Sequence, residues 1–211
     1  KRLADCRELA EPGVPGVTVV HRHERFTVSQ RIVAEPERDV LVIELTLTGD
    51  PQLGLYVLLA PHLGGTGRGN RAAVDSHHGR RVLWAEQGPF GLALAAVDAR
   101  QVDAMGPASA GYSGSSDGWQ DFARHGRMTW RYRRAGPGNV ALMAALPRHC
   151  ALALGFAGSW QAAATLAIAA LSQPFAAVWS TQIAQWRGRG ACDPVSGRGE
   201  WPHPPRDGAS G

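Results

Sequence analysis

The chain has 211 residues, of which 44% are hydrophobic and 19% charged, and this length suits one domain, or one and a half, with a buried core. The apolar content excludes a disordered chain, and no apolar run reaches the roughly 18–20 residues of a membrane span. The formal charge of +4 comes from arginine, because Lys1 is the only lysine. Enrichment in Arg, Ala and Gly together indicates a coding bias rather than a surface selected for nucleic acid. We recognise no secretory leader, so the localisation stays open.

The three cysteines carry little information. Cys6, Cys150 and Cys192 lie far apart in the chain, are odd in number and form no C-x-x-C pair. They give neither a disulfide framework nor the spacing of a zinc site. We interpret them as buried or incidental thiols, and no cofactor motif accompanies them.

Most of the chain shows the pattern of short strands. From Leu41 to Leu47 every second residue is Leu or Ile, while Glu44 and Thr46 share the other face, and this period of two marks a strand with one face in a core. We expect strands at Phe26–Ala34, Asp39–Thr48, Leu55–Ala60, Arg71–Ser76, Arg81–Glu86, Gly91–Val97, Met128–Arg133, Asn139–Leu146 and Cys150–Phe156. Strands spaced this closely, with no helices between them, predict an all-β fold in which antiparallel sheets pack as a β-sandwich.

The pattern changes at Ser159. From there to Arg187 an Ala-rich sequence carries apolar residues at helical spacing, with Ser159 as a suitable N-cap and Pro174 as a break between two helices. Beyond Arg187 the sequence is rich in Gly, Pro, Arg and Ser and has no periodicity, which is typical of a linker or a disordered tail. We therefore divide the chain into a β-sandwich domain (1–157), a helical linker (158–187) and a disordered tail (188–211).

Several polar segments are candidate sites with a simpler explanation. His21 and His23 would point to one face of a strand, but no further ligands are evident nearby, so we expect a solvated edge strand and no metal. The glycine-rich run from Pro61 to Asn70 lacks the lysine and the following helix of a phosphate-binding loop, so we interpret it as a long loop of functional shape. The Asp and His residues at 75–78 are interpreted as a solvated hairpin tip.

One arginine-rich segment comes nearest to a nucleic-acid site. Arginines at positions 124, 127, 131, 133 and 134 lie near Trp119, Trp130 and Tyr132 in the sequence. If 128–133 is a strand, alternation places its arginines on the face opposite Trp130 and Tyr132, so charge and base stacking do not converge. We therefore expect a solvated face and no nucleic-acid partner.

The least ordinary stretch is Ser113–Asp121, which combines two carboxylates, an amide, hydroxyls and an indole. An indole stacks on the face of a pyranose, while the side chains of Asp117, Gln120 and Asp121 can hydrogen-bond to sugar hydroxyls. By residue type, Asp117 and Asp121 are also candidates for paired catalytic carboxylates. The alternative is a turn in which Asp and Ser side chains cap the backbone while Trp119 fills the sandwich core.

Several motifs in a fixed order resemble one known domain. The run Tyr112–Asp121 (YSGSSDGWQD), with GNVAL at 138–142 and LALGF at 152–156, resembles the N-terminal β-sandwich of bacterial and archaeal glucoamylases and glucodextranases, glycoside hydrolase family 15. The upstream motifs DVL at 39–41, YVLLAPHL at 56–63 and GRGN at 67–70 fit the same domain. The resemblance covers Val17 to Trp186, and the Ala-rich stretch resembles the helical linker that leads into the catalytic domain of that family.

The resemblance implies a galactose-mutarotase-like super-β-sandwich followed by a helical linker. Full-length relatives hydrolyse α-glucosidic bonds with inversion, and their general acid and base are two glutamates of a following (α/α) barrel. No part of this chain resembles that barrel, so the resemblance implies no catalytic residue, no metal and no cofactor here. Relatives also have further strands before the region that matches Lys1–Val20, and the tail at 188–211 resembles no known domain. We therefore expect this chain to be a fragment of a larger enzyme.

The preferred hypothesis is a non-catalytic N-terminal domain that supports the barrel of a glucoamylase-like or glucodextranase-like enzyme, whose substrate is an α-glucan or oligosaccharide. The alternative is a free-standing carbohydrate-binding β-sandwich, and a third hypothesis is nucleic-acid binding through the arginine-rich segment. No membrane partner is expected. Residues expected at the barrel contact or near substrate are Ser116, Asp117, Trp119, Gln120, Asp121, His62 and Asn70.

Overall fold

The computed structural model describes residues 4–9 and 15–188, and over these residues the chain forms two antiparallel sheets and three α-helices. The strands are β1 (Ala4–Leu9), β2 (Gly16–His23), β3 (Phe26–Ala34), β4 (Val40–Gly49), β5 (Leu55–Leu59), β6 (Asn70–His77), β7 (Arg80–Gln87), β8 (Phe90–Val97), β9 (Ala108–Tyr112), β10 (Arg134–Gly138), β11 (Val140–Leu146) and β12 (His149–Ala157). The helices are α1 (Gly118–His125), α2 (Trp160–Ala170) and α3 (Phe175–Gly188), with a short 3-10 turn η1 at Leu63–Gly65.

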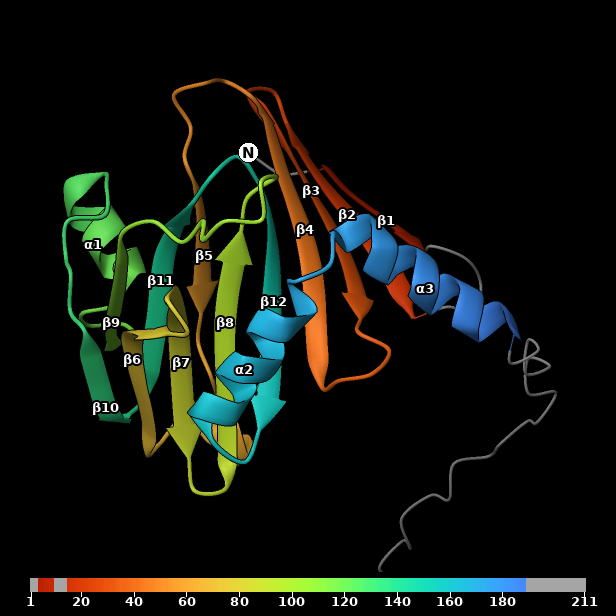
Figure 1. Cartoon of the computed structure of the whole chain (residues 1–211). Coiled ribbons are helices and arrows are strands. Elements are labelled where there is room, and N and C mark those ends of the chain that lie inside the picture. The colour runs from red at the N-terminus through yellow and green to blue at the C-terminus, as the bar shows by residue number, and fades with distance from the viewer. Residues whose placement is uncertain (1–3, 10–14, 189–211) are drawn as a thin grey trace, which may run out of the picture.

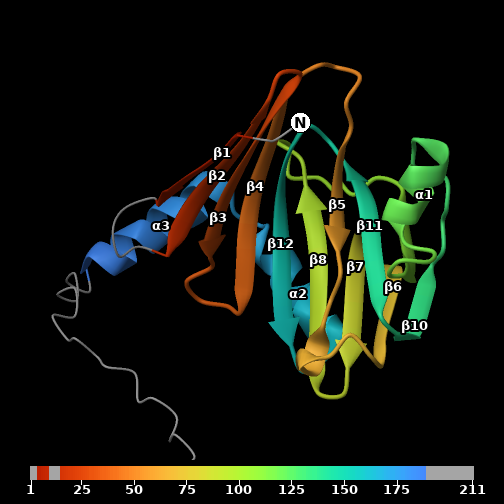
Figure 2. The same ribbon diagram turned by 180° about the vertical axis from the view of Figure 1, so that it is seen from behind.

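The two sheets and the C-terminal helices form three layers (Figure 1). The larger sheet has the strand order β1-β2-β3-β4-β12-β8-β7-β6-β10, and the smaller sheet has the order β5-β11-β9. The smaller sheet covers one face of the larger sheet around β6–β8 and β12, and α2 and α3 lie on the opposite face, as the view from behind shows (Figure 2). The expected all-β antiparallel sandwich with C-terminal helices is confirmed.

Each interface between layers has its own apolar core. Between the sheets, the buried side chains include Leu83, Leu94 and Leu142. Between the larger sheet and the helices, Val82 and Val97 pack with the small residues of α2, including Ala163 and Ala167. Because β8 contributes to both cores, it is apolar along nearly its whole length, which is the pattern of a strand covered on both faces.

The strand β4 departs from the expected burial of one face. Leu45 faces the smaller sheet and is buried, but Val40 and Val42 on the opposite face are buried too, at 3% and 1% exposure. Leu41 at the start of the strand stays 37% exposed. The C-terminal helices cover the face that alternation alone assigned to solvent.

The expected N-cap at Ser159 and the expected break at Pro174 are both present in the C-terminal helices. The Ser159 hydroxyl accepts the N–H of Ala162 as the N-cap of α2, and Pro174 lies directly before α3. Trp160 at the start of α2 stacks on Trp84 of β7, with ring centroids 4.8 Å apart. On α3, the Phe175 and Trp179 rings lie 5.0 and 4.4 Å from the Arg31 guanidinium of β3, so the two helices cover different parts of the larger sheet.

Eight of the nine expected strands are present with small shifts of their ends, but a strand at Met128–Arg133 is wrong. This segment, the 128–133 connection, runs between the edges of the two sheets without joining a ladder. Its Tyr132 carbonyl accepts the Ala110 N–H of β9, and the next carbonyl, of Arg133, accepts the Val74 N–H of β6. Backbone groups that would pair in a strand are therefore shared between two elements, and the predicted alternation of buried aromatic and exposed arginine side chains does not hold. Tyr132 is 47% exposed.

The remaining expectations concern the ends of the chain and membranes. The predicted tail falls outside the described residues, except for Gly188 at the end of α3. Within the described ranges no single helix is long and apolar enough to cross a membrane, whereas α2 and α3 taken together pass that test of length and composition but bend by 92° between them. Of the cysteines, Cys150 is free and buried in the core between the sheets, and burial raises its pKa to about 12.

Candidate functional site

The segment that the sequence singles out begins with a tight turn after β9. The Tyr112 carbonyl accepts the N–H groups of Ser115, Ser116 and Asp117 at 3.0–3.1 Å, and the Ser116 hydroxyl accepts the Tyr112 N–H at 3.0 Å. A Cβ on Gly111 would lie 2.0 Å from the Ser116 carbonyl oxygen, so only glycine allows this approach. The Ser116 hydroxyl therefore has a partner within the turn.

Asp117 is the N-cap of α1. Its Oδ1 atom accepts the N–H groups of Trp119 and Gln120 at 2.8 and 3.0 Å, and Oδ2 accepts the N–H of Gly114. The side chain is buried, at 5% exposure. A carboxylate at this position satisfies the free N–H groups of the first helical turn, which are the positive end of the helix dipole. Asp117 therefore acts on the backbone, as the turn alternative predicts.

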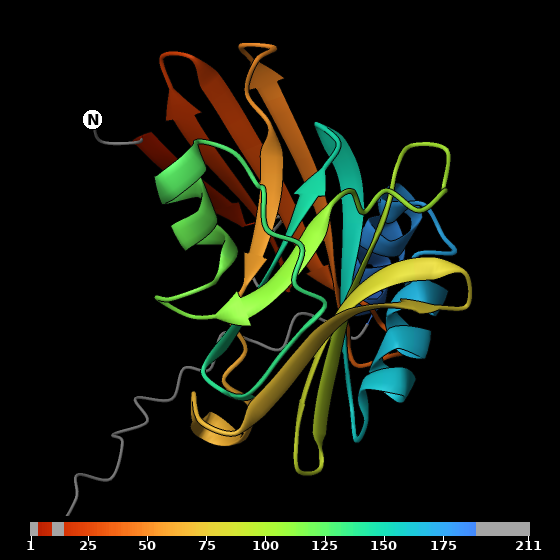
Figure 3. The same ribbon diagram turned by 90° about the vertical axis from the view of Figure 1, so that its left-hand side faces the viewer.

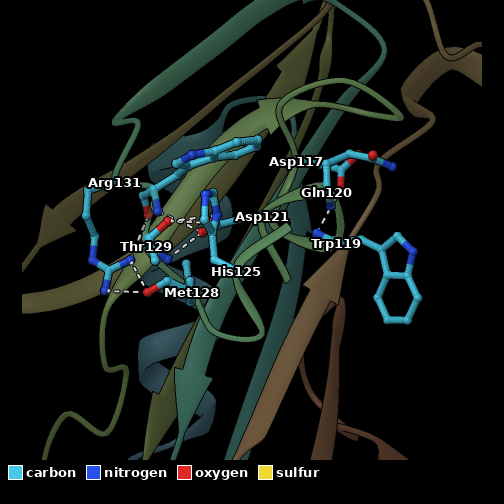
Figure 4. A network of polar contacts seen from close by, with 9 residues as sticks. Asp117, Trp119, Gln120, Asp121, His125, Met128, Thr129 and Arg131 are labelled. Atoms are coloured by element: carbon cyan, nitrogen blue, oxygen red, sulfur yellow. Dashed lines mark hydrogen bonds and ion pairs between the residues drawn. The ribbon is translucent and has the colours of Figure 1, made fainter. Parts of the chain in front are cut away.

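Asp121, one turn into α1, is fully buried and is the centre of a polar network (Figure 4). Its Oδ2 atom accepts the N–H groups of Thr129 and Trp130 at 2.5 and 2.7 Å, while Oδ1 accepts the Thr129 hydroxyl and lies 2.8 Å from His125 Nδ1. Burial raises the pKa of Asp121, but the hydrogen bonds from Thr129, Trp130 and His125 outweigh it and lower the pKa to about 2. The carboxylate is therefore ionised at neutral pH and joins α1 to the 128–133 connection.

The side chains that extend into solvent from this segment are different ones. Trp119 is 66% exposed and points away from the network, so the idea that it fills the sandwich core is wrong (Figure 4). Gln120 is half-buried beside it on the same helix. The α1 helix itself lies on the outer face of the smaller sheet, because a Cβ on Gly118 would meet Met143 of β11 and the Phe122 ring packs edge-on against Tyr56 of β5 at 4.8 Å.

The second predicted segment, His62–Asn70, is held in shape by its last residue. Asn70 is fully buried, its Oδ1 accepts the Leu63 N–H at 3.1 Å, and its Nδ2 donates to the Thr66 carbonyl at 2.9 Å. Because both ends of the amide are used within the loop, Asn70 is a positioning residue. His62 is exposed at the start of the loop.

Asn139, in the turn between β10 and β11, brings the two segments together. Its carbonyl accepts the Ser113 N–H at 2.9 Å. A Cβ on Gly67 would lie 3.3 Å both from the Asn139 Oδ1 atom and from His62 Nε2, so these two exposed side chains converge on Gly67. We call His62, Gly67, Tyr112, Ser113 and Asn139 the junction patch. Asn139 belongs to the GNVAL motif, but only the pairing of β11 with β5, the strand before the His62–Asn70 loop, reveals that it lies beside this loop.

Tyr112 contributes an aromatic ring to the junction patch, next to the Gly138–Asn139 turn. Its ring lies against Gly138, where a Cβ would be 3.0 Å from the Tyr112 ring, and its hydroxyl accepts the Gly136 N–H at 3.1 Å. The side chain is nevertheless 42% exposed. The junction patch therefore combines an imidazole, an amide, a hydroxyl and an exposed ring. These groups suit hydrogen bonding to a sugar or to a second domain.

The arrangement does not favour acid–base hydrolysis within this segment. Both candidate carboxylates, Asp117 and Asp121, are buried and bonded to their own backbone, whereas a glycoside hydrolase needs one carboxyl on each side of an open scissile bond. Over residues 4–9 and 15–188, no three His, Cys, Asp or Glu side chains are grouped so as to hold a metal ion. The groups that remain accessible to a ligand are the indole of Trp119, the amide of Gln120 and the side chains of the junction patch.

The fold defines the class of this protein as an antiparallel β-sandwich domain with C-terminal helices packed on the outer face of its larger sheet (Figure 3). The family model described as glucodextranase, domain N matches residues 2–188. The chain therefore belongs to the family of N-terminal glucoamylase and glucodextranase domains. No curated protein sequence matches it.

A solved structure gives the same fold. The crystal structure of a bacterial glucoamylase complexed with acarbose is similar to this chain with a TM-score of 0.81 and 21% sequence identity. The match covers 90% of this chain and 29% of the glucoamylase chain. At this identity the likeness shows the fold alone, and the chain spans less than a third of the relative that it matches.

Proposed function

We propose that this chain is the non-catalytic N-terminal domain of a glucoamylase-like or glucodextranase-like glycoside hydrolase, and that it supports an (α/α) barrel which hydrolyses α-glucosidic bonds. The observation that carries the proposal is the family match over residues 2–188, together with a fold that makes up 29% of a glucoamylase chain. The proposal divides the chain into the sandwich at 1–157, the helical linker at 158–187 and a tail at 188–211.

The junction patch is the surface that we assign to the barrel contact or to the substrate. Its side chains are exposed, while Asn70 and Asp117, which hold the two segments that carry it, are buried and hydrogen-bonded to the backbone. A contact surface needs this combination, because a rigid second layer keeps the polar groups in a fixed geometry. Ser116 contributes through its hydrogen bond to the Tyr112 backbone.

The test uses the purified chain and a separately expressed barrel of a family 15 glucoamylase. We expect the chain alone to release no glucose from maltoheptaose, and we expect it to raise the Tm of the barrel and to elute with it in size-exclusion chromatography. His62→Ala together with Asn139→Ala should weaken this association, whereas Arg22→Ala, on the exposed part of β2, should not. Glucose release by the chain alone, or an elution and Tm of the barrel unchanged by the chain, would refute the proposal.

A free-standing carbohydrate-binding module is the second candidate, and the exposed indole of Trp119 favours it. A flat aromatic ring that is 66% exposed is a suitable platform for a pyranose ring, with the Gln120 amide nearby. Titration with maltoheptaose should then change the tryptophan fluorescence. Trp119→Ala should abolish the change, and Trp186→Ala, which removes another exposed indole on α3, should retain it.

A further inference from the structure

A groove beside the β6–β7 hairpin gathers arginine side chains that the proposed function does not use. The groove has a volume of about 700 Å³ and lies between the β6–β7 hairpin, the segment before β9 and the 128–133 connection. Arg81, Arg131 and Arg133 line it, together with Asp75 and Asp103. We call it the arginine groove.

Two of its arginines are fixed by neutral partners. Arg81 Nη1 donates to the carbonyls of Met105 and Gly106 at 3.0 and 2.6 Å. Arg131 Nη1 donates to the carbonyls of Met128 and Trp130 at 3.0 and 2.7 Å (Figure 4). A carbonyl oxygen orients a guanidinium group but does not neutralise its charge, so these hydrogen bonds hold two positive charges in place without compensating them.

A second pair of arginines shares a single carboxylate. Arg133 Nη2 lies 3.3 Å from Asp75 Oδ1, and Arg134 Nη2 lies 3.5 Å from Asp75 Oδ2. The two arginine side chains are 75% and 71% exposed, and both distances are long for a charge-assisted hydrogen bond. These contacts are therefore weak, and an incoming anion can replace Asp75 as the partner of Arg133.

The other acidic residue of the groove is already engaged with its own chain. Asp103 Oδ2 accepts the Arg81 N–H at 3.0 Å, and Oδ1 accepts the Met105 N–H at 3.2 Å. The region thus has four arginines and two aspartates. One of these aspartates, Asp103, is bonded to backbone N–H groups and not to a guanidinium group. A concave surface whose positive charges are only partly neutralised attracts an anion.

We propose that the arginine groove binds an oxyanion of the phosphate class, either free or carried on a sugar. Guanidinium groups match the geometry of phosphate oxygens, and the exposed Arg133 supplies a donor that can rotate toward the ligand. Asp75 competes with the ligand for Arg133. The proposal does not depend on the barrel or glucan function proposed above, because neither requires an anion.

The test is isothermal titration calorimetry of the purified chain at low salt with inorganic phosphate, glucose 6-phosphate and neutral maltoheptaose. We expect saturable binding of the two phosphates, weakened by added NaCl, and no competition from maltoheptaose. Tighter binding of glucose 6-phosphate assigns the anion to a sugar, whereas equal binding assigns it to free phosphate.

Two substitutions should act in opposite directions. Arg133→Gln should weaken phosphate binding by about tenfold, because it removes a charge-assisted donor. Asp75→Asn should strengthen phosphate binding several-fold, because it removes the competing carboxylate. The matched controls Arg22→Gln on β2 and Asp39→Asn before β4 make the same charge changes at exposed positions outside the groove and should bind like the wild type.

Several results would overturn the proposal. An absence of saturable heat with both phosphates would do so, as would equal losses in Arg133→Gln and Arg22→Gln, which would indicate a general charge effect. Binding that Arg133→Gln leaves unchanged would place the anion elsewhere. A single-stranded oligonucleotide that binds while both phosphates fail would assign the arginines to nucleic acid instead.

Discussion

The Asp121 carboxylate accepts the backbone N–H of Trp130, nine residues further along the chain, at 2.7 Å. The bond links α1, on the outer face of the smaller sheet, to the connection that runs between the edges of β9 and β6. A side chain thus takes the place of a neighbouring strand as the partner of this backbone. The arrangement explains why a segment with strand-like alternation is not a strand, and it makes Asp121 the residue whose loss should matter most in this region.

Replacing Asp121 by Asn should destabilise the protein by about 3 kcal/mol, because it removes the charge and leaves one acceptor oxygen for the buried donors of Thr129 and Trp130 that two carboxylate oxygens now accept. Urea denaturation monitored by circular dichroism gives the free energy of unfolding. Asp39→Asn, which neutralises an exposed carboxylate, should change it by less than about 0.5 kcal/mol. Equal stabilities of Asp121→Asn and the wild type would contradict this account of the network.

The same network predicts a loss of stability in acid. The pKa of Asp121 is lowered from 3.8 to about 2 in the folded protein, so the unfolded chain binds a proton at a higher pH than the folded chain does. The stabilisation, about 2 kcal/mol, is present above about pH 4 and is lost as the pH falls toward 2. Thermal unfolding from pH 6 to pH 2 should show a smaller fall of Tm in Asp121→Asn than in the wild type. Parallel curves for the two proteins would contradict the assignment.

The sequence predicts most of the sandwich because alternation of apolar and polar residues reports burial directly. The range Phe26–Ala34 was predicted with the exact ends of β3. The pattern fails where residues are small or conformationally special: β9 has the sequence ASAGY and β10 has RAGPG, and neither shows a period of two. It misleads at 128–133, because M-T-W-R-Y-R alternates although its backbone partners lie on α1, β9 and β6.

The candidate site was predictable in residue type but not in orientation. The capping of the backbone by Asp117 was expected for a turn, but the helix α1 that it begins was not expected between the strands. The burial of Asp121 was not predictable, because its partners Thr129 and Trp130 belong to a segment whose path depends on the sheets. The approach of Gly67 to Asn139 likewise results from the pairing of β11 with β5, which are far apart in the chain, and local sequence does not encode it.

His77 should give the protein a second, milder pH dependence. Its Nε2 lies 2.8 Å from the Thr165 hydroxyl of α2, its ring meets those of His78 and Trp160, and Arg80 is its cross-strand neighbour. Burial, with a smaller contribution from the charge of His78, lowers the pKa of His77 below 6.5. The unfolded chain therefore takes up this proton first, and stability falls as the pH drops below about 6.5.

The measurement for His77 is the difference in Tm between pH 7.5 and pH 5.5. His77→Gln should reduce this difference, because the amide still reaches Thr165 but does not titrate. His62→Gln, which replaces an exposed histidine, should leave the difference unchanged. A Tm difference that is the same in His77→Gln and the wild type would show that the contact between the hairpin and α2 is not sensitive to pH.

Arg31 should hold α3 on the larger sheet. Its guanidinium lies over Phe175 and Trp179, and Nη1 pairs with Glu44 Oε2 of β4 at 3.1 Å. Arg31→Met keeps the apolar stem but loses the charge, and should destabilise the protein by about 1–2 kcal/mol. Hydrogen exchange should become faster in the amides of α3 than in those of α2. Arg22→Met on β2 is the control, and unchanged exchange in α3 would contradict the role of Arg31.

Gly155 on β12 should be intolerant of any side chain, because α2 lies directly on it. A Cβ at this position would be 2.3 Å from the Ala163 carbonyl oxygen, a contact with backbone that no side-chain rotation relieves. We expect Gly155→Ala to lower the free energy of unfolding by about 2–3 kcal/mol, because α2 must move away from the sheet. Gly158→Ala is the matched control, since the nearest atom to its Cβ would be the Pro89 carbonyl oxygen at 3.9 Å. Urea denaturation of both variants separates the two cases: similar losses would indicate a general cost of replacing glycine, whereas a loss confined to Gly155→Ala would show that the close approach of α2 to β12 is required.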